Sequence, residues 1–182
     1  MKRPSKSYEI ALSAIACAFA AIALTIGSYV DTLLPSGYIL AVFALMLPLA
    51  KQFIWGNALA FVGACLLAFL FNIGGVLKLI PFFMFLGLHP LMNFLQKKFI
   101  KSKILHGVAF AVKALWFDGM LLFTWFVLTP VFGLTELTFY DILEKYLWYL
   151  VFFGGTALFA AYDIAIFMCQ RTMDAVVRRL RK

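Results

Sequence analysis

Hydrophobic residues dominate the chain in six runs that short polar segments separate. The runs cover residues 8–29, 38–50, 53–72, 76–95, 105–128 and 147–169. A helix needs about 20 apolar residues to cross the roughly 30 Å hydrocarbon core of a bilayer, and most runs meet that length. The second run is short and ends at Pro48 and Lys51, so it is either a minimal span or one arm of a re-entrant pair. The pattern predicts an all-α polytopic membrane bundle with about six transmembrane helices, or five with a hairpin.

Composition supports a membrane protein and excludes a soluble domain. Hydrophobic residues make up 65% of the 182 residues and charged residues 13%, with a mean hydropathy of +0.99. Soluble domains carry about 45–50% apolar and about 25% charged residues. The first run is too long for a signal peptide and has no clean cleavage site, so we expect it to be retained as a helix. We interpret residues 1–182 as a single transmembrane domain with a basic cytoplasmic tail from about residue 170 to 182.

The placement of basic residues predicts the orientation. With six spans and a cytoplasmic N-terminus, the inner segments hold 13 of the 16 lysines and arginines, and the outer segments hold only Lys78 and Lys145. Such an excess in short cytoplasmic loops sets topology. We therefore expect a multi-pass protein of the bacterial cytoplasmic membrane with both termini inside. The basic tail either contacts anionic lipid headgroups or only anchors the last helix. Nucleic acid is not an expected partner, because the basic residues form no folded patch.

Motifs for catalysis or for a cofactor are not evident. The chain has no GxSxG, HExxH or phosphate-binding glycine loop, and its three cysteines are dispersed in apolar runs. His89 and His106 are expected to be hydrogen-bonded residues near the inner ends of their helices rather than metal ligands, and His89-Pro90 predicts a kink. The chain is therefore not expected to be an enzyme.

Three charged residues lie within the apolar runs, namely Lys113, Asp118 and Asp163. Each costs about 2.5–3.5 kcal/mol at a helix centre on insertion scales, so such residues are usually paired or functional. Lys113 and Asp163 lie at matching depths, about two turns from the inner boundary, and are predicted to form a buried ion pair. Asp118 lies deeper and on another face of its helix, without an obvious partner. A proton or ion pathway is the alternative role for these charges.

The first run carries two stripes of small residues at three- and four-residue spacing. One stripe holds Ala11, Ala14, Ala18, Ala21, Thr25 and Ser28, and its neighbour holds Ser13, Ala16, Ala20, Ala23 and Gly27. Membrane helices associate through such small-residue faces because their backbones can approach closely. Two stripes exceed what one neighbouring helix needs. They indicate either packing within the chain or docking of another membrane subunit.

Together these features resemble the substrate-binding S components of energy-coupling-factor (ECF) transporters. The resemblance rests on the six spans, the basic N-terminus, the AxxxA of Ala14 and Ala18, and the segments PFFMFLGLHPLMNFLQKKF and YDIAIFMCQRTMDAVVRRLRK. It implies a protein that binds a vitamin or related micronutrient on its outer side and docks through its first helices on a transmembrane coupling subunit driven by two ATPases. Ala14 and Ala18 match the docking motif. The vitamin-binding signatures of characterised members are not evident, so no particular substrate is implied.

A site for such a small molecule is expected among polar and aromatic residues on the outer side. The third outer segment, residues 133–150, also predicts a short amphipathic helix leading into the last span. The candidate binding residues are Asp31, Tyr38, Asn72, Lys78, Trp125, Glu136, Trp148 and Tyr149. Aromatic walls with one cation and a carboxylate suit a flat polar heterocycle, although the aromatic residues are equally typical of interfacial anchors. A structural scaffold subunit and an ion-coupled carrier using Asp118 and Lys113 are the alternative functions.

Overall fold

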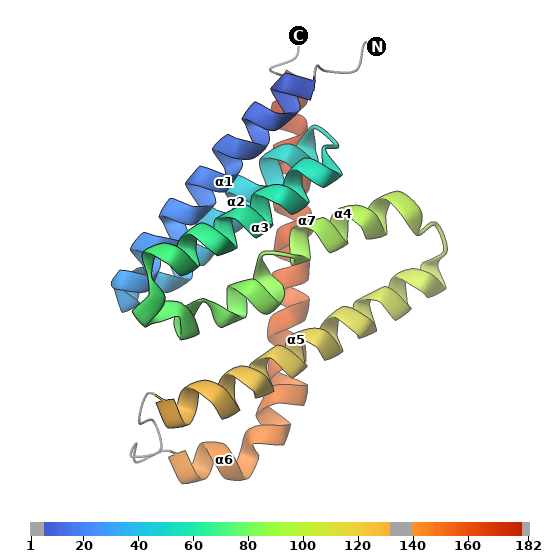
Figure 1. Cartoon of the computed structure of the whole chain (residues 1–182). Helices are drawn as coiled ribbons and strands as arrows, with labels where there is room; N and C mark the ends of the chain where they lie inside the picture. The colour runs from blue at the N-terminus through green and yellow to red at the C-terminus, as the bar shows by residue number, and fades with distance from the viewer. Residues whose placement is uncertain (1–5, 132–139, 180–182) are drawn as a thin grey trace. The chain divides into compact units, whose positions relative to one another are not determined.

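A computed structural model describes residues 6–131 and 140–179, which form helices almost throughout and contain no strand (Figure 1). Two short elements, η1 and η2, are 3₁₀ helices, and η3 and η5 are π-helices. In chain order the elements are α1 (Lys6–Tyr29), η1 (Asp31–Leu33), α2 (Leu34–Ala50), α3 (Ile54–Phe71), η2 (Ile73–Leu79), η3 (Phe82–Leu86), α4 (His89–Phe99), α5 (Lys103–Val131), α6 (Tyr140–Tyr149), η5 (Leu150–Gly155) and α7 (Thr156–Arg179).

The predicted all-α membrane fold is confirmed. Within the described ranges, five helical stretches are long and apolar enough to cross a membrane, and a sixth is present if one bent pair counts as a single span. The chain divides into two compact units, and α7 begins in one and ends in the other. The first unit holds the residues up to Leu95 and those from Phe167 onward, and the second holds Gln96–Ile166.

In the first unit, α1 packs along both α2 and α3 (Figure 1). The stripe of Ser13, Ala16, Ala20 and Gly27 is on the buried face of α1. α1 and α2 approach each other closely at Gly27 and Gly37. A Cβ atom on Gly37 would lie 2.7 Å from the carbonyl oxygen of Ala23 and 3.1 Å from the Cα atom of Gly27. This stripe is therefore used for packing within the chain, as one of the two predictions for it required.

The second apolar run is longer than its hydropathy suggested. α2 begins at Leu34, four residues before the predicted start, because Pro35 fits the first turn of a helix, where its missing N–H is not needed. With η1 in front of it, the stretch Asp31–Ala50 has 20 residues and is long enough to span on its own. The helix ends just before Lys51, as predicted, and Gln52 adopts a positive φ of 65° in the turn to α3.

The run at 76–95, predicted as one span with a kink at His89-Pro90, does not form one helix, and its main bend lies before Phe82. Residues 73–99 form the separate elements η2, η3 and α4, and the helical axis bends by 56° between Ile73–Leu79 and Phe82–Phe99. Pro81 stands at the bend, and a proline removes a backbone donor and disrupts the preceding turn. Irregular backbone at membrane depth must be covered by protein, and Leu79, Phe82 and Phe85 are accordingly fully buried.

The second unit pairs α5 with the run from α6 through η5 to the first part of α7. The predicted amphipathic helix before the last span is present as α6, but it continues into that span, so Tyr140–Ala175 forms one apolar stretch of 36 residues. Most residues of α6 are exposed and only Leu147 is buried. The run from η5 into α7 lies antiparallel to α5, because Thr156 contacts Asp118 whereas Asp163, later on α7, contacts Lys113, earlier on α5.

Candidate functional site

Four of the predicted binding residues belong to the first unit, and the structure brings them together at the end of the bundle where α1 meets η1. Lys78 Nζ lies 2.5 Å from Asp31 Oδ1, and the Tyr38 hydroxyl donates to the main-chain carbonyl of Lys78. The Asp31 side chain is 75% exposed, so the pair is open to solvent and contributes little stability. Asp31, Tyr38 and Lys78 therefore form one polar cluster.

Asn72 lies buried beside this cluster and is engaged at both ends of its amide. Its Nδ2 donates to Ser28 Oγ at 2.6 Å, and its Oδ1 accepts from the Gly75 backbone N–H at 3.1 Å. Ser28 in turn donates to the Thr25 carbonyl at 2.8 Å. Asn72 thus caps η2 and ties it to α1, which gives this residue a structural role in holding the cluster.

The other described binding candidates, Trp125, Trp148 and Tyr149, belong to the second unit. Trp125 stacks on Tyr140 with ring centroids 5.7 Å apart, and Trp148 stacks on Phe152 at 5.9 Å. Tyr149 is largely exposed, as is Trp148. Glu136 lies outside the described residues. The tryptophans thus form two separate aromatic pairs, an arrangement that suits interfacial anchors.

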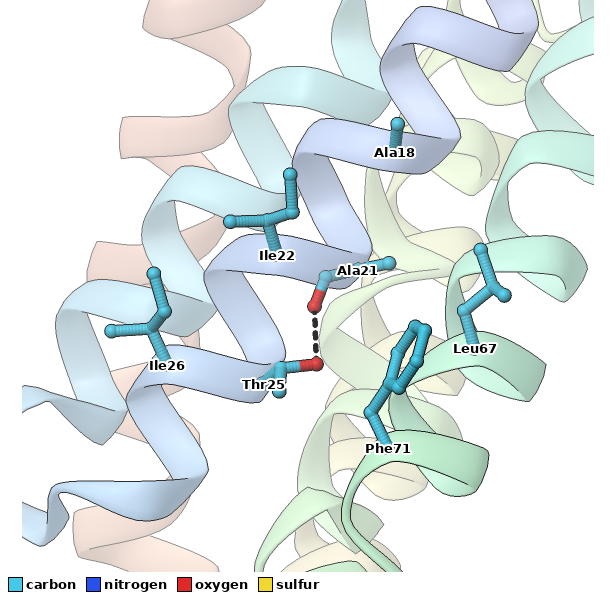
Figure 2. A pocket seen from close by; sticks show the side chains of 7 residues that line it. All are labelled: Ala18, Ala21, Ile22, Thr25, Ile26, Leu67 and Phe71. Atoms are coloured by element: carbon cyan, nitrogen blue, oxygen red, sulfur yellow. Dashed lines mark hydrogen bonds between the residues drawn. The ribbon is translucent and has the colours of Figure 1, made fainter.

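A groove of about 260 Å³ lies between α1 and α3, and of the predicted binding and docking residues it contains only Ala18 (Figure 2). Its only side chain with a polar atom is Thr25, whose hydroxyl donates to the Ala21 carbonyl at 2.7 Å and so presents no free donor. The groove is lined by Ala18, Ala21, Ile22, Thr25, Ile26, Leu67 and Phe71. Its lining suits apolar groups, and it does not suit the polar heterocycle expected from the sequence.

The predicted docking residues lie on the exposed side of α1. Ala14 and Ala18 are exposed, as is Ala11 one turn before them. Exposed isoleucines, Ile15 and Ile22, flank this face. The first half of this stripe, Ala11, Ala14 and Ala18, is therefore available to a helix from outside the chain. Ala21 and Ser28 in its second half are buried within the chain.

The predicted ion pair in the second unit is confirmed. Lys113 Nζ lies 2.7 Å from Asp163 Oδ1, and the two side chains are 6% and 8% exposed. The ring of Phe159, one turn from Asp163 on α7, lies 5.9 Å from Lys113 Nζ and packs on Phe117. The pair thus places its charges among aromatic rings and not in water.

Asp118 has a partner that the sequence analysis missed. Its Oδ2 accepts a hydrogen bond from the Thr156 hydroxyl at 3.0 Å, while its Oδ1 has no hydrogen-bond partner among the described residues. The carboxyl group is 2% exposed and lies against Gly155. Thr156 and Asp163 are seven residues apart on α7, and their partners Asp118 and Lys113 are five residues apart on α5, in the reverse order. The two pairs are therefore successive polar layers of one antiparallel contact, the seam between α5 and the η5–α7 run.

Further buried polar residues connect elements of the first unit. Asn57 donates to the Leu45 carbonyl at 2.6 Å, Gln170 donates to the Pro90 carbonyl at 2.7 Å, and Asn93 lies 3.2 Å from His89. The partners of Asn57 and Gln170 are 12 and 80 residues away in the sequence, and hydropathy gives no signal for such pairs. Asn93 and His89 lie one turn apart on α4. One indication that Asn57 is buried was available from the sequence, namely its place on the side of an apolar helix that carries the small residues.

The two histidines are hydrogen-bonded, as predicted. His89 pairs with Asn93, and His106 Nδ1 lies 3.0 Å from Gln96 Nε2. Within residues 6–131 and 140–179, no group of three histidine, cysteine or acidic side chains is arranged to hold a metal ion.

Comparisons of the chain with models of protein families, with curated proteins and with solved structures gave no significant match.

Proposed function

We propose that the chain is the membrane-embedded substrate-binding subunit of an ECF-type uptake transporter. In this role it binds a vitamin-like micronutrient at its outer side and docks on a transmembrane coupling subunit that two ATPases drive. The observation that carries the proposal is the free alanine face of α1.

This exposed face is suited to a helix from outside the chain, because the neighbouring stripe of α1 is the one used for packing within the chain. The stripe of Ser13, Ala16 and Ala20 is buried, whereas Ala14 and Ala18 remain exposed. Small residues exposed on a membrane helix allow close backbone approach by a partner, while lipid gains nothing from them. The adjoining groove at Ile22 and Leu67 offers space for larger side chains of such a partner (Figure 2).

The polar cluster at the outer end of the first unit supports a binding role. Asp31 and Lys78 supply one anion and one cation, and Tyr38 adds an aromatic ring and a hydroxyl. A small polar molecule can exchange its own hydrogen bonds for the exposed Asp31–Lys78 contact at little cost, because exposed ion pairs are worth about 0–1 kcal/mol.

Affinity purification from native bacterial membranes tests this function. The wild-type chain is expected to co-purify one further membrane protein and two ATPases, and Ala14→Trp or Ala18→Trp is expected to abolish their recovery. An indole at either position blocks close helix approach without entering the packed side of α1. The matched control is Leu59→Trp on α3, where the native side chain is 69% exposed and a tryptophan should be accepted.

Two results would contradict the proposal. The wild-type chain could purify without any ATPase, or both alanine variants could retain the complete assembly. Recovery of cell-envelope proteins in place of ATPases would indicate the scaffold alternative. Comparing the melting temperatures of the variants with that of the wild type separates lost docking from unfolding.

A further inference from the structure

The seam between α5 and the η5–α7 run contains two aspartates in different surroundings. Asp163 is bonded to the ammonium group of Lys113, whereas the described hydrogen bonds of Asp118 come from a hydroxyl group alone. The rings of Phe117 and Phe159 pack together, with centroids 5.7 Å apart, in the same seam. Both carboxyl groups are nearly excluded from solvent, at 6% and 2% exposure of the residue.

The described contacts of Asp118 include no cationic side chain. Between Ile104 and Pro130, the titratable residues of α5 besides Asp118 are His106 and Lys113. Lys113 is ion-paired with Asp163, and His106 lies about three turns before Asp118 and contacts Gln96. η5 contains no titratable residue, and on the adjoining part of α7 the titratable groups are Tyr162 and Asp163. An ionised carboxylate buried without a cation is strongly disfavoured, and such groups become neutral instead.

The local packing also disfavours a metal ion. Gly155 lies so close that a Cβ atom there would be 2.8 Å from Asp118 Oδ1 and 2.9 Å from Leu121 Cδ1. The side-chain oxygens in this contact are the two of Asp118 and the hydroxyl of Thr156. Ca²⁺ takes six to eight oxygen ligands, so this set is far too small. A proton needs no additional volume and no further ligand.

The backbone at this point has an unusual form. Residues Leu150–Gly155 form a π-helix, which occurs mostly as a single turn inside an α-helix and frequently at functional sites. It ends at the glycine that touches Asp118, and the next residue is Thr156. The widened turn and the two residues that contact the carboxyl group are therefore consecutive in the chain.

We propose that Asp118 is a proton-binding site in which the carboxyl group is neutral at neutral pH. Thr156 serves both protonation states, because a hydroxyl group can donate to a carboxylate or accept from a carboxylic acid. Loss of the proton is coupled to separation of η5 from α5, since the resulting anion requires water or a cation that the closed seam does not provide. This inference does not rest on the proposed transport function.

Infrared spectroscopy of the purified protein tests the protonation state. A neutral carboxylic acid gives a carbonyl stretch, distinct from carboxylate bands, that shifts when H₂O is exchanged for D₂O. We expect this band in the wild type at neutral pH and its loss in Asp118→Asn, which keeps the shape of a neutral acid. Asp141→Asn on the exposed part of α6 is the matched control and should retain the band. Thr156→Val should retain it at a changed frequency, because the hydrogen bond is lost.

A second measurement uses the wild-type protein alone and so does not depend on the folding of any variant. A hydrophobic carbodiimide adds to protonated carboxyl groups in apolar surroundings and leaves carboxylates unmodified. Mass spectrometry should find the adduct on Asp118 and not on Asp163, and its yield should fall as the pH is raised. An acid band that survives Asp118→Asn, absence of the band from the wild type, or equal labelling of both aspartates would overturn the proposal.

Discussion

Asp163 and Asp118 lie in one seam, and they show how a single residue type is accommodated in two ways. An isolated charge at a helix centre costs about 2.5–3.5 kcal/mol on insertion scales, and a partner at hydrogen-bond distance offsets much of that cost. Asp163 is paired with Lys113 at 2.7 Å, so both charges can remain. Asp118 is hydrogen-bonded to the hydroxyl group of Thr156 and not to a cation, so its surroundings favour the neutral acid.

The Lys113–Asp163 pair leads to a prediction about coupled substitutions. Removing one partner of a buried pair leaves an uncompensated charge and typically costs about 3–5 kcal/mol, whereas replacing both partners can cost little. We therefore expect Lys113→Met and Asp163→Leu each to lower the stability in detergent strongly, and the double variant to lose much less than the sum of both. Equilibrium unfolding in denaturant measures all four proteins of the cycle.

The control for this cycle is Asp141→Leu, which removes an exposed aspartate from α6. Surface substitutions of this kind usually change stability by less than about 0.5 kcal/mol. Additive effects of Lys113→Met and Asp163→Leu would show that the two side chains do not stabilise each other.

At the scale of elements, hydropathy predicted where helices occur but not how each one is built. The runs at 8–29, 53–72 and 105–128 correspond closely to α1, α3 and α5, because an uninterrupted apolar run in lipid has to satisfy its own backbone. The run at 76–95 failed as a continuous helix, since Pro81 interrupts it and apolar composition alone carries no information about hydrogen-bond pattern. The start of α2 was missed because the apolar run was taken from residue 38, whereas Pro35 lies in the first turn of the helix.

The contact between η5 and α5 predicts a difference between two adjacent glycines. A Cβ atom on Gly155 would lie 2.8 Å from Asp118 Oδ1, whereas a Cβ atom on Gly154 would have no atom within 4 Å. Overpacking of a filled interior typically costs about 1–3 kcal/mol. We expect the unfolding free energy of Gly155→Ala to be lower than that of Gly154→Ala by about that amount, because only the methyl group at residue 155 enters a filled site. Both residues lie in the same π-helix.

Thermal unfolding of the two variants in the same detergent measures this difference. The helical propensity of the two substitutions is the same, so it cancels in the comparison. Equal melting temperatures for Gly154→Ala and Gly155→Ala would mean that η5 does not pack against Asp118 as described.

At the scale of the whole molecule, the sequence predicted those contacts that follow from how deep the residues lie in the membrane. Lys113 and Asp163 could be paired because residues equally far from one membrane surface meet when helices are antiparallel. Asp31, Tyr38 and Lys78 were grouped by the same reasoning from their shared outer side. Thr156 was missed because a hydroxyl group does not lower hydropathy enough to be noticed, and the groove at Ala18 was missed because it depends on side-chain shapes on two helices.

The number of membrane crossings depends on the bent segment of residues 73–99, which leads to the last prediction. If Ile73–Leu79 and Phe82–Phe99 together cross the membrane, the chain has six spans and the loop at Lys101 lies on the same side as the N-terminus. If this pair is re-entrant, five spans remain, and Lys101 and the C-terminus move to the outside. The excess of basic residues at 97–103 favours a cytoplasmic position.

We expect Thr32→Cys to react with a membrane-impermeant maleimide in intact bacterial cells, and Lys101→Cys to react only after permeabilisation. Both positions are exposed, and Cys17, Cys65 and Cys169 are replaced by alanine to remove background labelling. Labelling of Lys101→Cys in intact cells would instead establish the re-entrant arrangement and five spans.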